Sequence, residues 1–190
     1  MKLYDYENYE EYRKLQIAAN KQKLHAVWCS ESTVEKVCEM YPNSKNILCH
    51  GARNGREVEW FIKYFPDATV TGTDISPTAN EFSNMFEWDF HERKEEWVGK
   101  FDILYSNSFD HSYYPEKCLK TWTDQLTEEG ILCVELMVGD NNVSSRMDPL
   151  QISKGEFLGI IDDLGFEEVV TFNVTAKHGN SRVVVCKRKI

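Results

Sequence analysis

Five short apolar runs recur along the chain. They are separated by segments in which apolar residues return every three or four positions. The runs are typical of buried strands, and the second spacing is typical of amphipathic helices. The expected strands are 46–50, 68–73, 85–90, 101–105 and 130–137. Strands that alternate with helices predict an α/β fold, with a mostly parallel sheet and helices on both of its faces.

Local signals predict where several helices begin and end. Capping-box patterns start at Ser32 and Ser153, since each serine is followed three positions later by a glutamate. Ser76 precedes a proline and Pro115 opens an apolar-periodic segment, and both features favour the first turn of a helix. Gly165 follows the last helical segment and predicts a left-handed stop.

The two ends of the chain fall outside this alternation. The opening segment is charged and tyrosine-rich, and we expect a helix over about 4–28 that is either a structural cover or a lid over a site. Two final strands, 166–176 and 181–188, flank His178-Gly179-Asn180 and predict an antiparallel hairpin, which makes seven strands in all. The expected organisation is a cover segment, 1–30, and one domain, 31–190.

Composition and charge exclude several partners. The 190 residues suit one domain, and 22 basic against 31 acidic residues give a net charge of −9, which argues against nucleic acid. No run approaches the ~20 apolar residues of a membrane helix, so we expect no membrane partner. The six cysteines form no C-x-x-C pair and stand mostly in apolar runs, which indicates reduced core thiols in a cytoplasmic protein.

Candidate chemistry gathers at the ends of the expected strands, where parallel α/β sheets bind ligands. Gly51 and Gly55 follow the first strand, and two glycines at such a turn let a ligand approach the backbone. Asp74 follows the second strand and can accept two hydrogen bonds from a ribose diol. Each feature has a plain alternative, a simple turn or a helix-capping aspartate, although Ser76 already supplies the cap. Arginine replaces the later glycines of G-x-G-x-x-G, so a dinucleotide site is not indicated.

At these residues the chain resembles the class I S-adenosylmethionine-dependent methyltransferases, over about residues 30–190. The segments that resemble the family's motifs are 47–55, 70–77, 101–108 and 126–132, together with Asp89. The chain departs from the family at Cys49, where an acid is usual, and at Arg53, where glycine is usual. Arg53 could narrow the cofactor pocket or pair with the methionine carboxylate. The resemblance implies a single-domain Rossmann-like fold with an antiparallel C-terminal hairpin.

The resemblance also implies S-adenosylmethionine as cofactor, with S-adenosylhomocysteine as product. The implied cofactor-binding residues are Gly51, Ala52, Arg53, Asn54, Gly55, Asp74, Ile75, Asp89, Phe90 and Ser106. The loop after the fourth strand supplies the candidate catalytic residues Asn107, Asp110 and His111. A histidine there can accept a proton from a hydroxyl near neutral pH, or it can simply bond a loop carbonyl.

The expected activity is in-line methyl transfer to a small molecule, a sugar or another metabolite, with O-methylation favoured, by a monomer or homodimer. Some small O-methyltransferases of this fold hold a divalent ion between an acid and an Asp-Asn pair. Asp110 and Asp140-Asn141 match that pattern only superficially, so we expect no metal. The alternative from another class is a non-catalytic, cofactor-binding partner subunit. A nicotinamide oxidoreductase is disfavoured, because the chain lacks the required glycines and Tyr-x-x-x-Lys.

Overall fold

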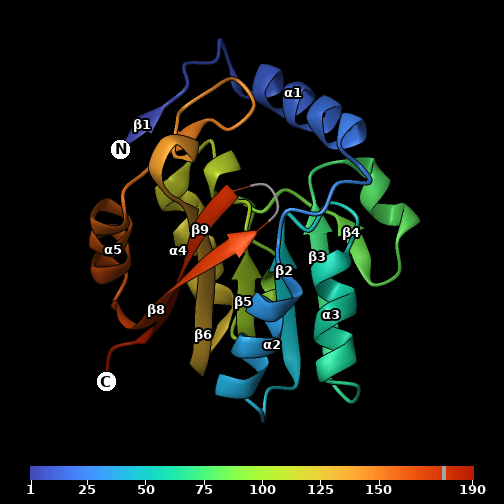
Figure 1. Cartoon of the computed structure of the whole chain (residues 1–190), viewed down its shortest axis with the longest axis vertical. Helices are drawn as coiled ribbons and strands as arrows, with labels where there is room; N and C mark the ends of the chain where they lie inside the picture. The colour runs from blue at the N-terminus through green and yellow to red at the C-terminus, as the bar shows by residue number, and fades with distance from the viewer. Residues whose placement is uncertain (177–178) are drawn as a thin grey trace.

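The parallel sheet expected from the sequence is present (Figure 1). The computed structural model of the chain describes residues 1–176 and 179–190, so the turn predicted at His178 lies outside the described residues. The strand order is β4-β3-β2-β5-β6-β9-β8, and β9 runs antiparallel to both of its neighbours. The strands are β2 (Asn46–His50), β3 (Thr69–Asp74), β4 (Met85–Glu87), β5 (Phe101–Ser106), β6 (Leu126–Met137), β8 (Phe166–Ala176) and β9 (Gly179–Arg188).

Helices cover both faces of the sheet, as predicted. The α-helices are α1 (Tyr9–Gln22), α2 (Glu31–Met40), α3 (Arg56–Tyr64), α4 (Pro115–Gln125) and α5 (Lys154–Asp163). Side chains of β2 point alternately to the two faces. Ile47 and Cys49 pack with α2 and α3, whereas Leu48 packs with α4 and α5. The strand alternation therefore builds two hydrophobic layers, and the carboxyl ends of the strands stay available for a site.

Two helix starts differ from the prediction. Ser30, not Ser32, precedes α2, and the Ser32 hydroxyl bonds Ser30 Oγ at 2.7 Å instead of completing a capping box. The extended backbone of Ser30 places its carbonyl to accept from the amide of Thr33, which begins the helix earlier. The predicted box at Ser153 is present. After Ser76 the chain forms a short 3-10 helix, η1 (Pro77–Glu81), instead of an α-helix.

The predicted strands also shift at their ends. β4 stops at Glu87 instead of continuing to residue 90, because β3 ends at Asp74, whose carbonyl accepts the last bond from the amide of Trp88; the chain then turns, with the amide of Glu92 donating to the carbonyl of Asp89. β6 begins at Leu126, before the predicted residue 130. Further 3-10 turns are η2 (Glu95–Trp97), η3 (Phe109–His111) and η4 (Gly139–Asn141). Gly165 adopts φ +78°, as its predicted stop requires.

The cover segment (residues 1–30) lies across the carboxyl-end edge of the sheet. Figure 1 shows α1 above the tips of β2, β3 and β5, so the helix predicted over 4–28 is present in its central part. The strand β1 (Lys2–Leu3) pairs antiparallel with β7 (Leu150–Gln151) and fixes the segment's beginning. Among the described residues, no helix combines the length and the apolar content needed to cross a membrane.

Candidate cofactor and acceptor site

The loop after β2 turns sharply against the loop after β5. Gly51 has φ +70° and Gly55 has φ +71°, both in the left-handed region that favours glycine. A Cβ on Gly51 would lie 2.5 Å from Ser108 Cβ, so only glycine fits there. Arg53 has φ +44°, an uncommon conformation for a residue with a side chain. Its guanidinium donates to the carbonyl of Ala26 at 3.3 Å, which ties the loop to the cover segment.

Asp74 holds this turn in place. Its Oδ2 accepts from the amide of Arg53 at 3.1 Å, and its Oδ1 accepts from the amide of Ser76 at 2.9 Å. The serine cap therefore does not free Asp74 from local bonding. Burial raises the pKa of Asp74 even though both amides and the Arg53 charge favour its ionised form. Each carboxylate oxygen has a second lone pair, so the carboxylate retains capacity for a ribose diol.

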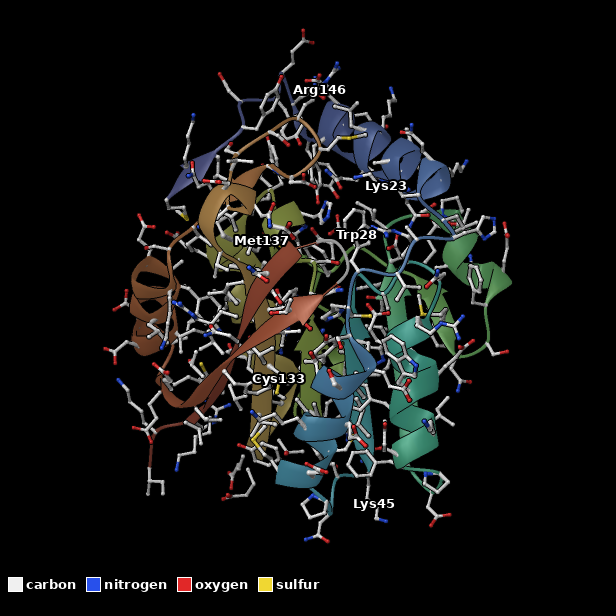
Figure 2. All side chains as sticks on the ribbon, viewed as in Figure 1. Lys23, Trp28, Lys45, Cys133, Met137 and Arg146 are labelled. Atoms are coloured by element: carbon white, nitrogen blue, oxygen red, sulfur yellow. The ribbon has the colours of Figure 1, made fainter. Side chains whose placement is uncertain are left out.

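Two neighbouring cavities open at this end of the sheet. The larger cavity, of about 180 Å³, is lined by Ala52, Asn54 and the loop after β5 (residues 107–111). The smaller, of about 40 Å³, is lined by Asp74, Ile75 and Phe90. Gly51 and Arg53 border both cavities, as do Lys23, Ser108 and His111. Figure 2 shows Lys23, Trp28 and Met137 near the larger cavity, whereas Lys45 and Cys133 lie toward the other end of the sheet.

Side chains of α1 occupy the space above Asp74. Tyr12, Gln16 and Asn20 line the smaller cavity and are all buried. Asn20 Oδ1 accepts from Thr78 Oγ1 at 2.8 Å, but Asn20 Nδ2 is buried with no hydrogen-bond partner among the described residues. A buried donor without a partner costs about 1–3 kcal/mol. A ligand with an acceptor atom at this position would satisfy it, and the sequence analysis did not identify Asn20.

Three of the expected cofactor residues line neither of these two cavities. Gly55 starts α3, and Ser106 is buried, with its hydroxyl donating to the carbonyl of His50 at 2.9 Å. Asp89 Oδ1 accepts from the amide of His91 at 2.9 Å and lies 2.7 Å from His91 Nδ1. Asp89 Oδ2 is buried and has no hydrogen-bond partner among the described residues. Phe90 is also largely buried in the α4 layer, although it lines the smaller cavity.

Two buried glutamates line the larger cavity. Burial raises the pKa of the Glu57 carboxyl to about 7, and Glu135 contributes to the shift by like charge. Glu135 accepts hydrogen bonds from the Tyr105 hydroxyl and from Ser181 Oγ, the latter at 2.8 Å. With the amide orientation assigned from its neighbours, Asn107 donates to Glu57 Oε1 at 3.3 Å. Neither glutamate is among the residues predicted from the sequence, although a glutamate in the apolar strand 130–137 is a usable signal.

The expected acceptor-side residues lie together, beside an aspartate that the sequence did not indicate. Asn107, Asp110 and His111 all border the larger cavity. His111 Nδ1 bonds Gln16 Oε1 of α1 at 2.9 Å, not a loop carbonyl. His111 Nε2 lies 4.0 Å from Asp110 Oδ1 and 3.6 Å from Asp148 Oδ1. Burial raises the pKa of Asp110.

Comparison with known proteins places this geometry in a fold family. No protein-family model and no curated protein matches the chain in sequence. The 1,6-didemethyltoxoflavin-N1-methyltransferase of Burkholderia thailandensis, solved with S-adenosylhomocysteine, has a TM-score of 0.78 at 13% identity, over 98% of this chain and 93% of that chain. Magnesium protoporphyrin IX methyltransferase from Synechocystis PCC 6803 has a TM-score of 0.70 at 14% identity, over 96% and 100%. A TehB-like methyltransferase from Corynebacterium glutamicum has a TM-score of 0.64 at 18% identity, over 95% and 98%. The chain therefore has the Rossmann-like fold of the class I S-adenosylmethionine-dependent methyltransferases.

Proposed function

We propose that the protein binds S-adenosylmethionine and transfers its methyl group to a small molecule, with a hydroxyl oxygen as the favoured acceptor. The observation that carries the proposal is the tight loop from Gly51 to Gly55, bonded to Asp74 at the end of the next strand. The similar structures include a mitomycin 7-O-methyltransferase, a carbon methyltransferase and the cyclase SpnF, so the fold alone does not select the acceptor atom.

The proposed cofactor residues lie in or beside the two cavities. In the proposal, Gly51, Ala52, Arg53 and Asn54 border the methionine part, and Gly55 shapes the turn into α3. Asp74 accepts from the ribose hydroxyls, while Ile75, Asp89 and Phe90 surround the adenine and Ser106 supports the loop beneath it. The unpartnered amide of Asn20 and the spare lone pairs of Asp74 fit a polar nucleoside at this position. Because α1 occupies much of this space, cofactor entry requires the cover segment to move, which makes it a lid.

The acceptor binds on the other side of the methyl group. S-adenosylmethionine would supply a methyl group on a sulfonium: the acceptor oxygen would form a bond to the methyl carbon as the carbon–sulfur bond breaks in line with it, and the sulfur would keep the bonding electron pair. Asn107 and Asp110 position the acceptor, and His111, which lines the same cavity, takes the hydroxyl proton on Nε2. Gln16 fixes the imidazole by bonding its Nδ1. The buried thiols support a cytoplasmic protein, and we propose that it works as a monomer or homodimer.

Calorimetry with S-adenosylmethionine, S-adenosylhomocysteine and NAD tests the proposal. We expect saturable binding of the first two and no response to NAD. A panel of hydroxylated and amine-bearing small molecules, with formation of S-adenosylhomocysteine as the readout, then tests catalysis. Binding without turnover on any acceptor would favour the non-catalytic partner subunit. Binding of NAD alone would refute the cofactor assignment.

A further inference from the structure

Three potential metal ligands meet at one wall of the larger cavity. Asp110 and His111 come from η3, after β5, and Asp148 comes from the segment between η4 and β7. One ligand atom from each residue lies within 4.8 Å of the other two. These atoms are carboxylate oxygens and an imidazole nitrogen, a donor set that divalent transition metals accept.

Hydrogen bonding around His111 directs its second nitrogen at the two carboxylates. Gln16 Nε2 donates to the carbonyl of Met147 at 3.0 Å, which leaves Gln16 Oε1 as the atom that faces His111. An amide oxygen only accepts, so His111 Nδ1 carries the proton and donates it to Gln16. His111 Nε2 is then an acceptor facing Asp110 and Asp148. This support of one ring nitrogen by a neighbouring oxygen is the usual arrangement around metal-bound histidines.

The carboxylate of Asp110 provides an independent observation. Its Oδ1 is buried and has no hydrogen-bond partner among the described residues. A buried carboxylate oxygen is stable only when a donor or a cation compensates it. In the observed conformation His111 Nε2 does not supply that bond, because its distance of 4.0 Å from Asp110 Oδ1 exceeds the usual hydrogen-bond length of about 2.7–3.2 Å. A metal with bonds of about 2.1 Å separates neighbouring ligand atoms by roughly 3–3.5 Å, which small side-chain rotations reach here.

We propose that Asp110 Oδ1, Asp148 Oδ1 and His111 Nε2 bind one divalent cation of the Mn²⁺, Fe²⁺ or Zn²⁺ class. Its remaining coordination positions face the larger cavity, where water or an oxygen of a small molecule can occupy them. The sequence pattern alone predicts no metal, because it sets Asp110 beside 140–141. The fold instead brings Asp148 to Asp110. The cation and a proton compete for the same lone pair of His111 Nε2. Metal binding therefore tests, independently of cofactor binding, whether this nitrogen is a metal ligand or a base.

The test uses the full chain, treated with chelator and then titrated with Mn²⁺ alone. Loss of the free Mn²⁺ signal in electron paramagnetic resonance, together with calorimetry, should show one saturable site. Asp148→Asn and His111→Gln should each weaken binding by about 10–100-fold or more. Asp140→Asn is the matched control, because Asp140 is exposed on η4 and belongs to the same connection. Circular dichroism and thermal unfolding verify that each variant is folded.

Absence of a saturable Mn²⁺ site in the wild type would overturn the proposal. So would an equal loss in Asp148→Asn and Asp140→Asn, since that result indicates diffuse attraction to the acidic surface. If Asp148→Asn does not fold, His111→Gln against Asp140→Asn decides the question. Cofactor binding is measured separately in the presence of chelator, so failure of the metal site and failure of the methyltransferase proposal give different results.

Discussion

Replacing Asp74 should affect both the stability of the fold and the affinity for the cofactor. In Asp74→Ala the amides of Arg53 and Ser76 lose their acceptor; the bond to Ser76 is buried and the bond to Arg53 is partly buried. An unsatisfied buried donor costs about 1–3 kcal/mol, so the free energy of unfolding should fall by about 1–3 kcal/mol if water reaches the other donor. A chain of this size loses about 2–4 °C in Tm for each kcal/mol.

The same substitution removes the charged acceptor proposed for the ribose hydroxyls. Hydrogen bonds to a charged group contribute about 1.5–3 kcal/mol, which corresponds to a loss of roughly 10–100-fold in affinity for S-adenosylhomocysteine. Calorimetry on Asp74→Ala, with thermal unfolding measured in parallel, separates the two effects. Asp67→Ala, which changes an exposed aspartate on the loop before β3, is the matched control and should alter neither quantity.

Asp74→Asn distinguishes shape from charge. The amide keeps the size of the side chain but retains only one acceptor oxygen, so either Arg53 or Ser76 should lose its bond. We expect an intermediate loss of stability together with nearly the full loss of affinity. A folded Asp74→Ala variant whose affinity equals that of the wild type would refute the reasoning and show that the ribose is held elsewhere.

Three further predictions follow from buried or strained positions. Because burial raises the pKa of Glu57 to about 7, the folded state keeps a proton that the unfolded chain releases above its usual pKa of 4.5. Glu57 therefore makes the free energy of unfolding fall by up to roughly 3 kcal/mol as pH rises between about 4.5 and 7. Glu57→Gln should flatten that decline in thermal unfolding, and equal slopes of stability against pH in the variant and the wild type would contradict this. Gly51→Ala should lower the free energy of unfolding by about 2–4 kcal/mol, because the new methyl group clashes with Ser108. Gly99 has a similar φ of +65° but no neighbour within 4 Å, so Gly99→Ala should cost only the backbone strain of about 1–2 kcal/mol. His111→Ala should leave S-adenosylhomocysteine affinity within about twofold and lower turnover by about 10²–10⁴-fold, and unchanged turnover would remove this histidine from the acceptor site.

The order of the elements was predictable because local apolar patterns dictate it. The runs at 46–50 and 101–105 became buried neighbouring strands, since side chains on both of their faces require cover. The capping box at Ser153 formed because both of its bonds are local. The box at Ser32 did not form, since Ser30, two residues earlier, is extended and begins the helix itself.

The candidate site was predictable only where it consists of a strand end and the loop that follows it. Asn107, Asp110 and His111 share one loop, so the sequence already placed them together. Asp148 and Gln16 approach His111 from segments far along the chain, and no local pattern encodes such a meeting. Glu57 presents the same difficulty, because its burial against Glu135 depends on how α3 packs against the sheet.

The attachment of the cover segment has a consequence for the kinetics of the protein. The segment is bonded to the 142–151 connection through Tyr6 and Gln16, which donate to the carbonyls of Arg146 and Met147. At its other end, the carbonyl of Leu24 accepts from Asn54 in the loop after β2. The cover segment therefore closes both the cofactor side and the acceptor side of the site, and one opening motion must expose the two sides together. We expect the departure of the methylated product and of the spent nucleoside to share a single slow step, whose rate rises when either attachment is weakened.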